Sequence, residues 1–135
     1  ARRFYKPQDL ADLCTFLQDL EPDEPLLWVG LGSNLLVRDG GFPGTVIFTF
    51  GALTALDWLD DNTLRVEAGV SCARVARETT RRGLTGVEFL AGIPGTMGGA
   101  LAMNAGAFGG ETWQRVVAVE TVDRYGRLQR DTGRE

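Results

Sequence analysis

The stretch LAGIPGTMGGALAMNAGAFGG, from Leu90 to Gly110, combines an apolar character with many glycines and a proline. It has no charged residue and holds seven of the 18 glycines of the chain. A run this apolar is long enough for a transmembrane helix, and the G-x-x-x-G spacing of Gly95 and Gly99 suits helix pairing. However, each interior glycine costs about 1 kcal/mol in a helix and a proline about 3 kcal/mol. With Pro94 among the glycines, a continuous helix is disfavoured and no membrane partner is expected.

Two interpretations of this stretch remain. Its glycines can serve tight turns in a compact loop, or its backbone can lie directly against a large flat ligand. In the second case amide N–H groups supply the polar contacts. The only polar side chains in the stretch are those of Thr96 and Asn104. Because it offers no acid or base, we expect it to bind a ligand rather than to transform one.

A second glycine-containing segment, GLGSN at Gly30–Asn34, follows the apolar run Leu26–Val29. Such a turn can direct successive N–H groups at an anion, although a plain structural turn is equally compatible with it. A Rossmann motif would need a third glycine and a following helix, and a P-loop would need its lysine. Both are missing. The two segments together suggest a ligand with a phosphate part and a flat part, as in a dinucleotide.

Apolar periodicity predicts an α+β fold with a lobe boundary near Gly51. Ser71 is the expected N-cap of the second helix, whose arginines are expected on a solvated face rather than in a phosphate patch. The predicted elements are a helix over 7–20, strands over 26–30, 35–39 and 45–50, a hairpin of 55–60 with 63–69, a helix over 72–82, and a hairpin of 115–123 with 127–132.

Composition excludes several classes of protein. The net charge of −4 gives no nucleic-acid footprint. The absence of histidine rules out a histidine-ligated metal or a Ser-His-Asp triad within the sequence, and no metal is expected. Two cysteines, Cys14 and Cys72, make no disulfide framework, which favours a reducing compartment. The start lacks the apolar core of a signal peptide, and both ends look cut from a longer chain.

The segments GLGSNLL (30–36) and GVEFLAGIPGTMGGALAMNAGAFGGE (86–111) resemble the flavin-binding part of the UDP-N-acetylenolpyruvoylglucosamine reductases. The spacing between them and the motif FPGTVI (42–47) also fit, so the resemblance covers nearly the whole chain. Leu31 stands where that family often has Gly or Glu, and Phe108 where it often has Tyr. The loss of a hydroxyl leaves the role of Phe108 open.

The resemblance implies a two-lobed α+β FAD-binding domain of the vanillyl-alcohol-oxidase (PCMH) type. Residues 1–50 would form the first lobe, residues 51–135 the second, and FAD would lie between them. The C-terminal substrate domain of the family would be absent. The cofactor-binding residues that the resemblance implies are Gly30, Gly32, Ser33, Asn34, Leu35, Gly92, Ile93, Pro94, Gly95, Thr96, Gly98, Gly99, Ala100, Met103, Asn104, Gly106 and Ala107.

The activity implied is the NADPH-dependent reduction of UDP-N-acetylglucosamine enolpyruvate to UDP-N-acetylmuramate for peptidoglycan, in the bacterial cytoplasm. The family's catalytic serine, arginine and glutamate would lie beyond Glu135, so no catalytic residue is assigned here. None of Arg115, Arg124, Arg127 and Arg130 matches the family's Tyr-Arg motif. Two alternatives stay open: the FAD domain of another oxidoreductase of this fold, and a non-enzymatic nucleotide-binding or interaction module.

Overall fold

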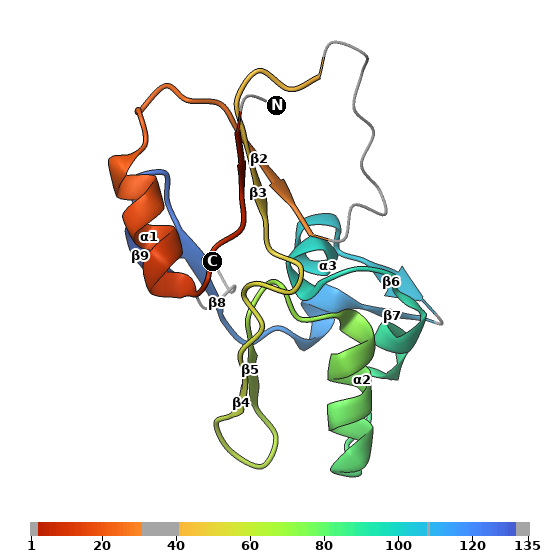
Figure 1. Cartoon of the computed structure of the whole chain (residues 1–135). Helices are drawn as coiled ribbons and strands as arrows, with labels where there is room; N and C mark the ends of the chain where they lie inside the picture. Colours follow the sequence, from red (N-terminus) through yellow and green to blue (C-terminus); the bar gives the residue numbers. More distant parts are fainter. Residues whose placement is uncertain (1–2, 31–40, 108, 132–135) are drawn as a thin grey trace.

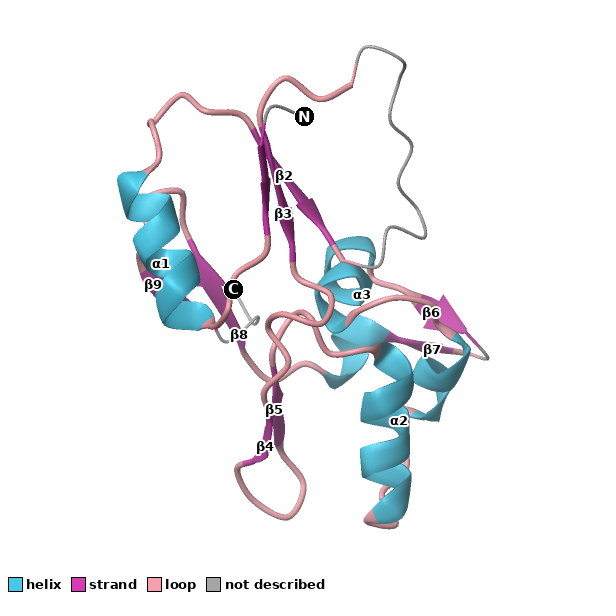
Figure 2. Ribbon diagram, viewed as in Figure 1, coloured by secondary structure: helices cyan, strands magenta, loops and turns pink. Residues whose placement is uncertain are grey.

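The structure is a computed structural model that describes residues 3–30, 41–107 and 109–131. Helices, strands and short hairpins alternate in it, which confirms the α+β class (Figure 2). The elements in chain order are β1 (Arg3–Tyr5), α1 (Leu10–Asp19), β2 (Leu26–Val29), β3 (Thr45–Phe48), β4 (Leu56–Trp58), β5 (Leu64–Val66), α2 (Cys72–Arg81), η1 (Glu88–Gly92), α3 (Met97–Met103), β6 (Gly106–Ala107), β7 (Gly110–Glu111), η2 (Thr112–Arg115), β8 (Val119–Val122) and β9 (Leu128–Asp131).

The first part of the chain forms a three-stranded parallel sheet in the order β1-β3-β2. Helix α1 packs on one face of it through Leu13 and Leu17, which are buried together with Ile47 of β3. The helix begins after Asp9, whose side chain accepts a hydrogen bond from the Asp12 amide at 2.8 Å. The predicted range of the helix, which begins at Pro7, therefore starts too early. The residue that caps the helix is Asp9, and the helix itself begins at Leu10.

The hairpin β8–β9 lies beside α1, although almost the whole chain separates them (Figure 1). Val122 packs against the cluster around Leu13, and the Arg124 guanidinium donates to the Pro22 carbonyl oxygen at 2.9 Å. A side chain at Gly126, which has a φ of 79°, would collide with the backbone of Cys14. The division into lobes at residue 50 stays a prediction. Val122, which belongs to the predicted second lobe, packs against the buried cluster around α1 in the predicted first lobe.

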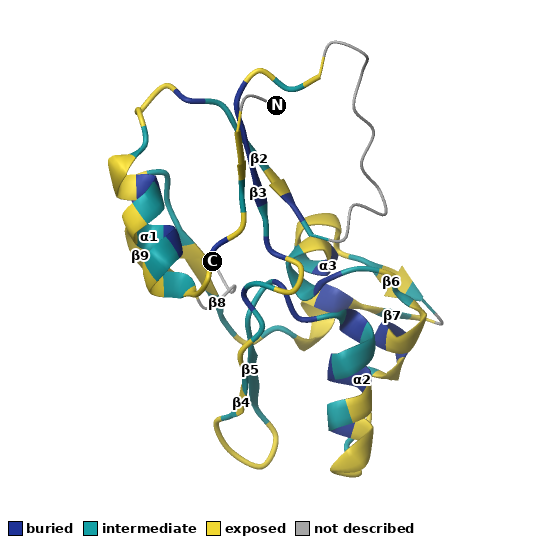
Figure 3. Ribbon diagram, in the orientation of Figure 1, coloured by how far each residue is buried: buried dark blue, intermediate teal, exposed yellow. Residues whose placement is uncertain are grey.

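A second buried cluster holds α2, η1 and α3 together. Helix α2 begins at Ser71, whose side chain accepts from the Arg74 amide, as predicted. The face of α2 that packs on this cluster is buried, and the C-terminal end of the helix is exposed (Figure 3). The buried members of the cluster are Val70, Cys72, Val75, Ala76, Phe89, Leu90 and Ala100.

Both predicted hairpins form, as β4–β5 and β8–β9. An ion pair joins them, because the Arg65 guanidinium donates to a Glu120 carboxylate oxygen at 2.7 Å. This contact raises the pKa of Arg65 and lowers that of Glu120. The pair is partly solvated, so it orients the hairpins more than it stabilises them.

Candidate functional site

The glycine-rich stretch folds into several short elements rather than one helix or one loop. It runs from η1 through a turn into α3 and then into the small hairpin β6–β7. The prediction that no continuous helix spans the stretch is confirmed, although Gly98 and Gly99 lie inside the short helix α3. Tertiary contacts and caps at both ends offset the low helix propensity of glycine over these seven residues.

The start of α3 is bonded to the segment that precedes α2. The Met97 amide donates to the Val70 carbonyl at 2.9 Å, and the Gly98 amide donates to the Ala68 carbonyl at 3.0 Å. A Cβ atom at Gly98 would lie only 2.9 Å from the Cβ atom of Ala68. Gly98 is therefore glycine because two backbones pack closely. The amides of Met97 and Gly98 bond within the protein, so these two amides fit the first interpretation of the stretch, in which the glycines serve compact packing.

The two glycine-containing motifs of the sequence meet at Gly30 and Thr96. Gly30 follows the last residue of β2, and Thr96 is the N-cap of α3. A Cβ atom at Gly30 would collide with Oγ1 of Thr96 and lie 3.3 Å from its Cγ2. Thr96 is almost fully buried and accepts a hydrogen bond from the Gly99 amide at 3.4 Å. The sheet and α3 thus approach each other closely at this contact, and only glycine fits at position 30.

Gly99 differs from its neighbour Gly98. It is exposed, and among the described residues a Cβ atom there would meet only Oγ1 of Thr96, at an ordinary contact distance of 3.7 Å. The turn before α3 contains Gly95 at a φ of 112°, a conformation that other residues rarely adopt. This turn and the first turn of α3 present backbone to the outside beside the Gly30–Thr96 contact. A bare backbone surface of this kind fits a large cofactor that makes close contacts.

The C-terminal end of α3 is tied to the hairpin β6–β7. Asn104 adopts the left-handed conformation, and its side chain bonds to both Glu111 and the backbone of Trp113. The indole Nε1 of Trp113 donates to the Leu101 carbonyl at 2.8 Å. Sequence reasoning missed Glu111 and Trp113. The available signal was the polar pair Glu111 and Gln114, which forms a capping box at η2.

The structure brings the described members of the predicted set into one continuous segment next to Gly30. Among them, Ala100 is turned into the buried cluster and Ile93 packs against it. Met103 is exposed, with 61% of its surface accessible. Gly32, Ser33, Asn34 and Leu35 lie outside the described residues, as do Leu31, the predicted strand over 35–39 and Phe108.

Cys72 is next to this segment, because its backbone amide donates to the Gly95 carbonyl at 3.0 Å. Cys72 is fully buried, and burial raises the pKa of its thiol. It therefore stays protonated at neutral pH and is a packing residue rather than a nucleophile. Both cysteines are free thiols, in agreement with the sequence analysis.

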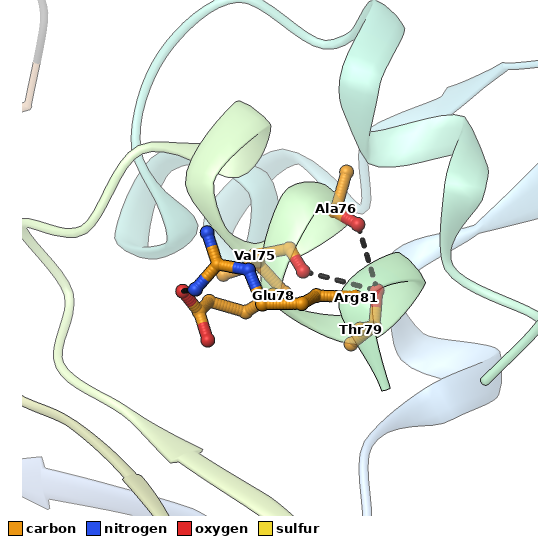
Figure 4. A network of polar contacts seen from close by, with 5 residues as sticks. All are labelled: Val75, Ala76, Glu78, Thr79 and Arg81. Atoms are coloured by element: carbon orange, nitrogen blue, oxygen red, sulfur yellow. Dashed lines mark hydrogen bonds and ion pairs between the residues drawn. The ribbon is translucent and has the colours of Figure 1, made fainter. Parts of the chain in front are cut away.

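A shallow groove of about 610 Å³ lies between α2 and η1, and its lining includes Ala91, which precedes Gly92 of the predicted set. Along α2, Arg81 pairs with Glu78 at 3.0 Å, and the Thr79 hydroxyl donates to the Val75 and Ala76 carbonyls (Figure 4). The polar groups drawn there bond to their own helix. This agrees with a solvated face, and the groove contains no predicted site residue. Its lining is Ala73, Ala76, Arg77, Thr80, Arg81, Glu88 and Ala91.

Among the described residues, no group of three or more His, Cys, Asp or Glu side chains could hold a metal ion. In residues 3–30, 41–107 and 109–131, no helix has the length and apolar character needed to cross a membrane.

Comparison with known proteins agrees with this geometry. A family model described as "FAD binding domain" matches residues 1–132. UDP-N-acetylenolpyruvoylglucosamine reductase of Alkalilimnicola ehrlichii is 63% identical over 130 residues, which cover 96% of this chain and 43% of that protein. The enzyme of the same name from Legionella pneumophila (strain Corby) is 61% identical over 129 residues, covering 96% of this chain and 42% of that one.

A solved structure is also similar. The UDP-N-acetylenolpyruvylglucosamine reductase (MurB) of Thermus caldophilus superposes with a TM-score of 0.75 at 33% sequence identity, covering 96% of this chain and 45% of the other. This chain thus spans less than half the length of the relatives it matches. The family model, by contrast, covers nearly all of it, and the structure places the two glycine-containing motifs in contact. The chain belongs to the FAD binding domain family.

Proposed function

We propose that this chain is the FAD-binding part of a flavoenzyme that uses NADPH to reduce UDP-N-acetylglucosamine enolpyruvate to UDP-N-acetylmuramate. This reaction would serve peptidoglycan synthesis in the bacterial cytoplasm. The support is the identity of about 60% to relatives that carry the reductase name, together with the family match. The division of the chain into lobes of residues 1–50 and 51–135, with a substrate domain outside this chain, belongs to the same proposal.

The contact between Gly30 and Thr96 is the observation that carries this proposal. It brings Gly30, the first residue of the segment proposed to bind phosphate, next to the segment proposed to lie along a flat ring, and one dinucleotide could use both. The residues proposed to lie along FAD are Gly30, Gly32, Ser33, Asn34, Leu35, Gly92, Ile93, Pro94, Gly95, Thr96, Gly98, Gly99, Ala100, Met103, Asn104, Gly106 and Ala107.

These residues do not all act in the same way. Gly30 and Gly98 permit close packing of backbones, and Ala100 anchors α3 in the buried cluster. Gly99 and Gly95 are the described residues best suited to direct contact with FAD. Gly99 is exposed, and no described atom would collide with a Cβ atom placed there. Gly95 has a positive φ, which favours glycine. FAD supplies hydride transfer when it is bound, and the chain supplies the surface that holds it.

The segment from Gly92 to Ala107 contains no acidic or basic side chain. In the segment from Gly92 to Ala107 the polar side chains are Thr96, which is buried, and Asn104, which bonds within the protein. We therefore place proton transfer to the substrate, and binding of the sugar nucleotide, outside this chain.

Titration of the purified chain with FAD tests the proposal. We expect saturable binding that quenches flavin fluorescence, with one FAD per chain. Absence of any FAD binding would contradict it and favour a non-enzymatic interaction module. An FAD-binding chain whose longer parent oxidises a sugar or lactone, and does not reduce the enolpyruvyl nucleotide, would favour another oxidoreductase of this fold.

A further inference from the structure

Asn104 ends α3 in a conformation that few residues adopt. Its φ is 46° and its ψ is 52°, and it is the only non-glycine residue with positive φ among those described. Asparagine tolerates this conformation better than most residues, because its short polar side chain can bond locally. The residue type thus fits the backbone, but glycine would fit it equally well. The side chain needs a separate explanation.

The side chain of Asn104 uses both of its polar atoms inside the protein. Its Nδ2 donates to Oε2 of Glu111 at 3.3 Å, and its Oδ1 accepts from the Trp113 amide at 3.0 Å. These bonds join the end of α3 to the end of β7 and the start of η2. These two bonds hold both polar atoms of the amide in place, so the side chain is fixed by Glu111 and Trp113 whether or not a ligand is bound.

The bonds of Asn104 close the base of the hairpin β6–β7. The chain leaves α3 at Asn104, turns through the hairpin, and returns at Glu111, which pairs with Gly106. The Thr112 amide and hydroxyl both donate to the Ala105 carbonyl, at 3.0 and 2.8 Å. A hairpin with two residues in each strand does not hold its own shape in water. Its orientation is therefore set from outside the hairpin, by these bonds at its base and by the packing of Ala107 and Gly110 on the cluster that contains Phe89.

We propose that Asn104 is a positioning residue for the cofactor, acting through Glu111 and Trp113. It fixes the hairpin that carries Gly106 and Ala107 against α3, and its side chain does not bind FAD. This inference rests on the proposed function, in which FAD lies along α3 and the hairpin. It replaces a direct side-chain contact of Asn104 with an indirect one.

Reversing the polarity of the Asn104–Glu111 bond tests this role. Three variants of the 135-residue chain are needed: Asn104→Asp, Glu111→Gln, and both together. In Asn104→Asp a carboxylate faces the Glu111 carboxylate, and the two like charges repel each other at the base of the hairpin. In the double variant the new amide at position 111 donates to the new carboxylate at position 104. The Trp113 amide keeps an acceptor in all three.

We expect Asn104→Asp to raise the FAD dissociation constant about tenfold, within the range measured for coupled polar pairs. Glu111→Gln should stay within about threefold of the parent, because its amide oxygen still accepts from Asn104. The double variant should return to within about threefold of the parent. Visible circular dichroism of the bound flavin, which reports ring orientation, should change in Asn104→Asp and recover in the double variant.

Thermal unfolding separates positioning from general stability. All variants should keep a melting midpoint within a few degrees of the parent, and Asn104→Gly provides a second test that keeps the left-handed backbone without the side chain. Asn104→Gly should weaken FAD binding about fivefold and also alter the flavin dichroism. A parent chain that fails to bind FAD overturns the proposed function and this inference together. A parent that binds FAD, with Asn104→Asp and Asn104→Gly binding equally well, or with no recovery in the double variant, overturns this inference alone.

Discussion

Gly30, at the end of the parallel sheet, lies directly against the side chain of Thr96, the N-cap of α3. Two motifs far apart in the sequence thus share one contact, and each constrains the residue type of the other. Thr96 needs its hydroxyl to cap α3, since the Gly99 amide bonds to it. Position 30 needs glycine because that hydroxyl occupies the place of a Cβ atom.

Replacing Gly30 with alanine should therefore destabilise the chain and weaken FAD binding. The added methyl group collides with Oγ1 of Thr96, and overpacking of this kind costs about 1–3 kcal/mol. We expect a lower denaturation midpoint in urea. The FAD dissociation constant should rise at least tenfold, because the sheet and α3 have to move apart at the contact between Gly30 and Thr96. Equilibrium unfolding and FAD titration measure the two effects.

The partner substitution Thr96→Ala provides the control for this clash. Thr96→Ala alone should cost about 1 kcal/mol through loss of the cap. Combined with Gly30→Ala, it removes the colliding hydroxyl, so the double variant should be more stable than the sum of the single effects predicts. Strict additivity of the two free energies would show that these residues do not touch.

Gly99→Leu should block FAD while leaving the fold intact. Gly99 is exposed, with open space beyond Thr96, so a leucine there collides with nothing in the described part of the protein. It would instead occupy the surface proposed for the flat ring. We expect a loss of FAD binding of at least tenfold with α1, from Leu10 to Asp19, unchanged, as judged by titration and circular dichroism.

Gly98→Ala is the matched control, because it makes a smaller change one residue away. Its Cβ atom would lie 2.9 Å from that of Ala68, so its effect should appear first as lower stability. If Gly99→Leu unfolds the chain while Gly98→Ala does not, the exposed glycine serves packing, and the cofactor surface lies elsewhere.

Cys72 and Cys14 should differ in reactivity. Cys72 is fully buried whereas Cys14 is partly exposed. A thiol reagent at pH 8 should label Cys14 at least tenfold faster, with Cys72 labelled only on unfolding. Burial raises the pKa of Cys72, so its contribution to stability is complete below the ordinary thiol pKa of about 8.5 and is lost as the pH rises toward the raised value. Mass spectrometry of the labelled peptides, and unfolding at neutral and alkaline pH, check both statements.

Local sequence signals predicted the elements that local chemistry determines. The apolar stripe of Leu13 and Leu17 and the cap at Ser71 gave α1 and α2 to within a few residues. They failed at α3, where Gly98 and Gly99 are helical because Thr96 and the backbone of Ala68 and Val70 hold them. Helix propensity describes an isolated chain and carries no information about such tertiary bonds.

The candidate site was predictable as two motifs but not as one contact. Nothing local to Gly30 indicates that it meets Thr96, because the contact depends on how the sheet packs against α3. For the same reason the sequence does not predict the two bonds that the Asn104 side chain makes within the protein. A polar residue in a glycine-rich segment suggests a ligand contact when its partners inside the fold are unknown.

The 135-residue chain should bind FAD and yet fail to reduce the enolpyruvyl sugar nucleotide. The segments around α3 supply binding surface, and the polar side chains there, Thr96 and Asn104, are used inside the fold. Reduction of an enolpyruvyl group needs a proton at one carbon as hydride reaches the other, and a positioned acid commonly contributes 10²–10⁴-fold. Loss of one well-placed electrostatic donor costs a further factor of about 10²–10³. Water could deliver the proton, but without positioning or stabilisation of the developing charge.

The measurement is the loss of NADPH that depends on the sugar nucleotide, in the presence of FAD and the purified chain. Oxidation of NADPH by oxygen through bound FAD is subtracted with a control that lacks the sugar nucleotide. We expect no substrate-dependent rate above background, and a sugar nucleotide dissociation constant too weak to measure by calorimetry, because its pocket would lie in the remainder of the longer protein. Turnover near the value of about 10 s⁻¹ that is ordinary for enzymes would contradict the prediction. It would place the catalytic groups within these 135 residues, where the arginines of α2 and of the hairpin β8–β9 would be the first positions to replace.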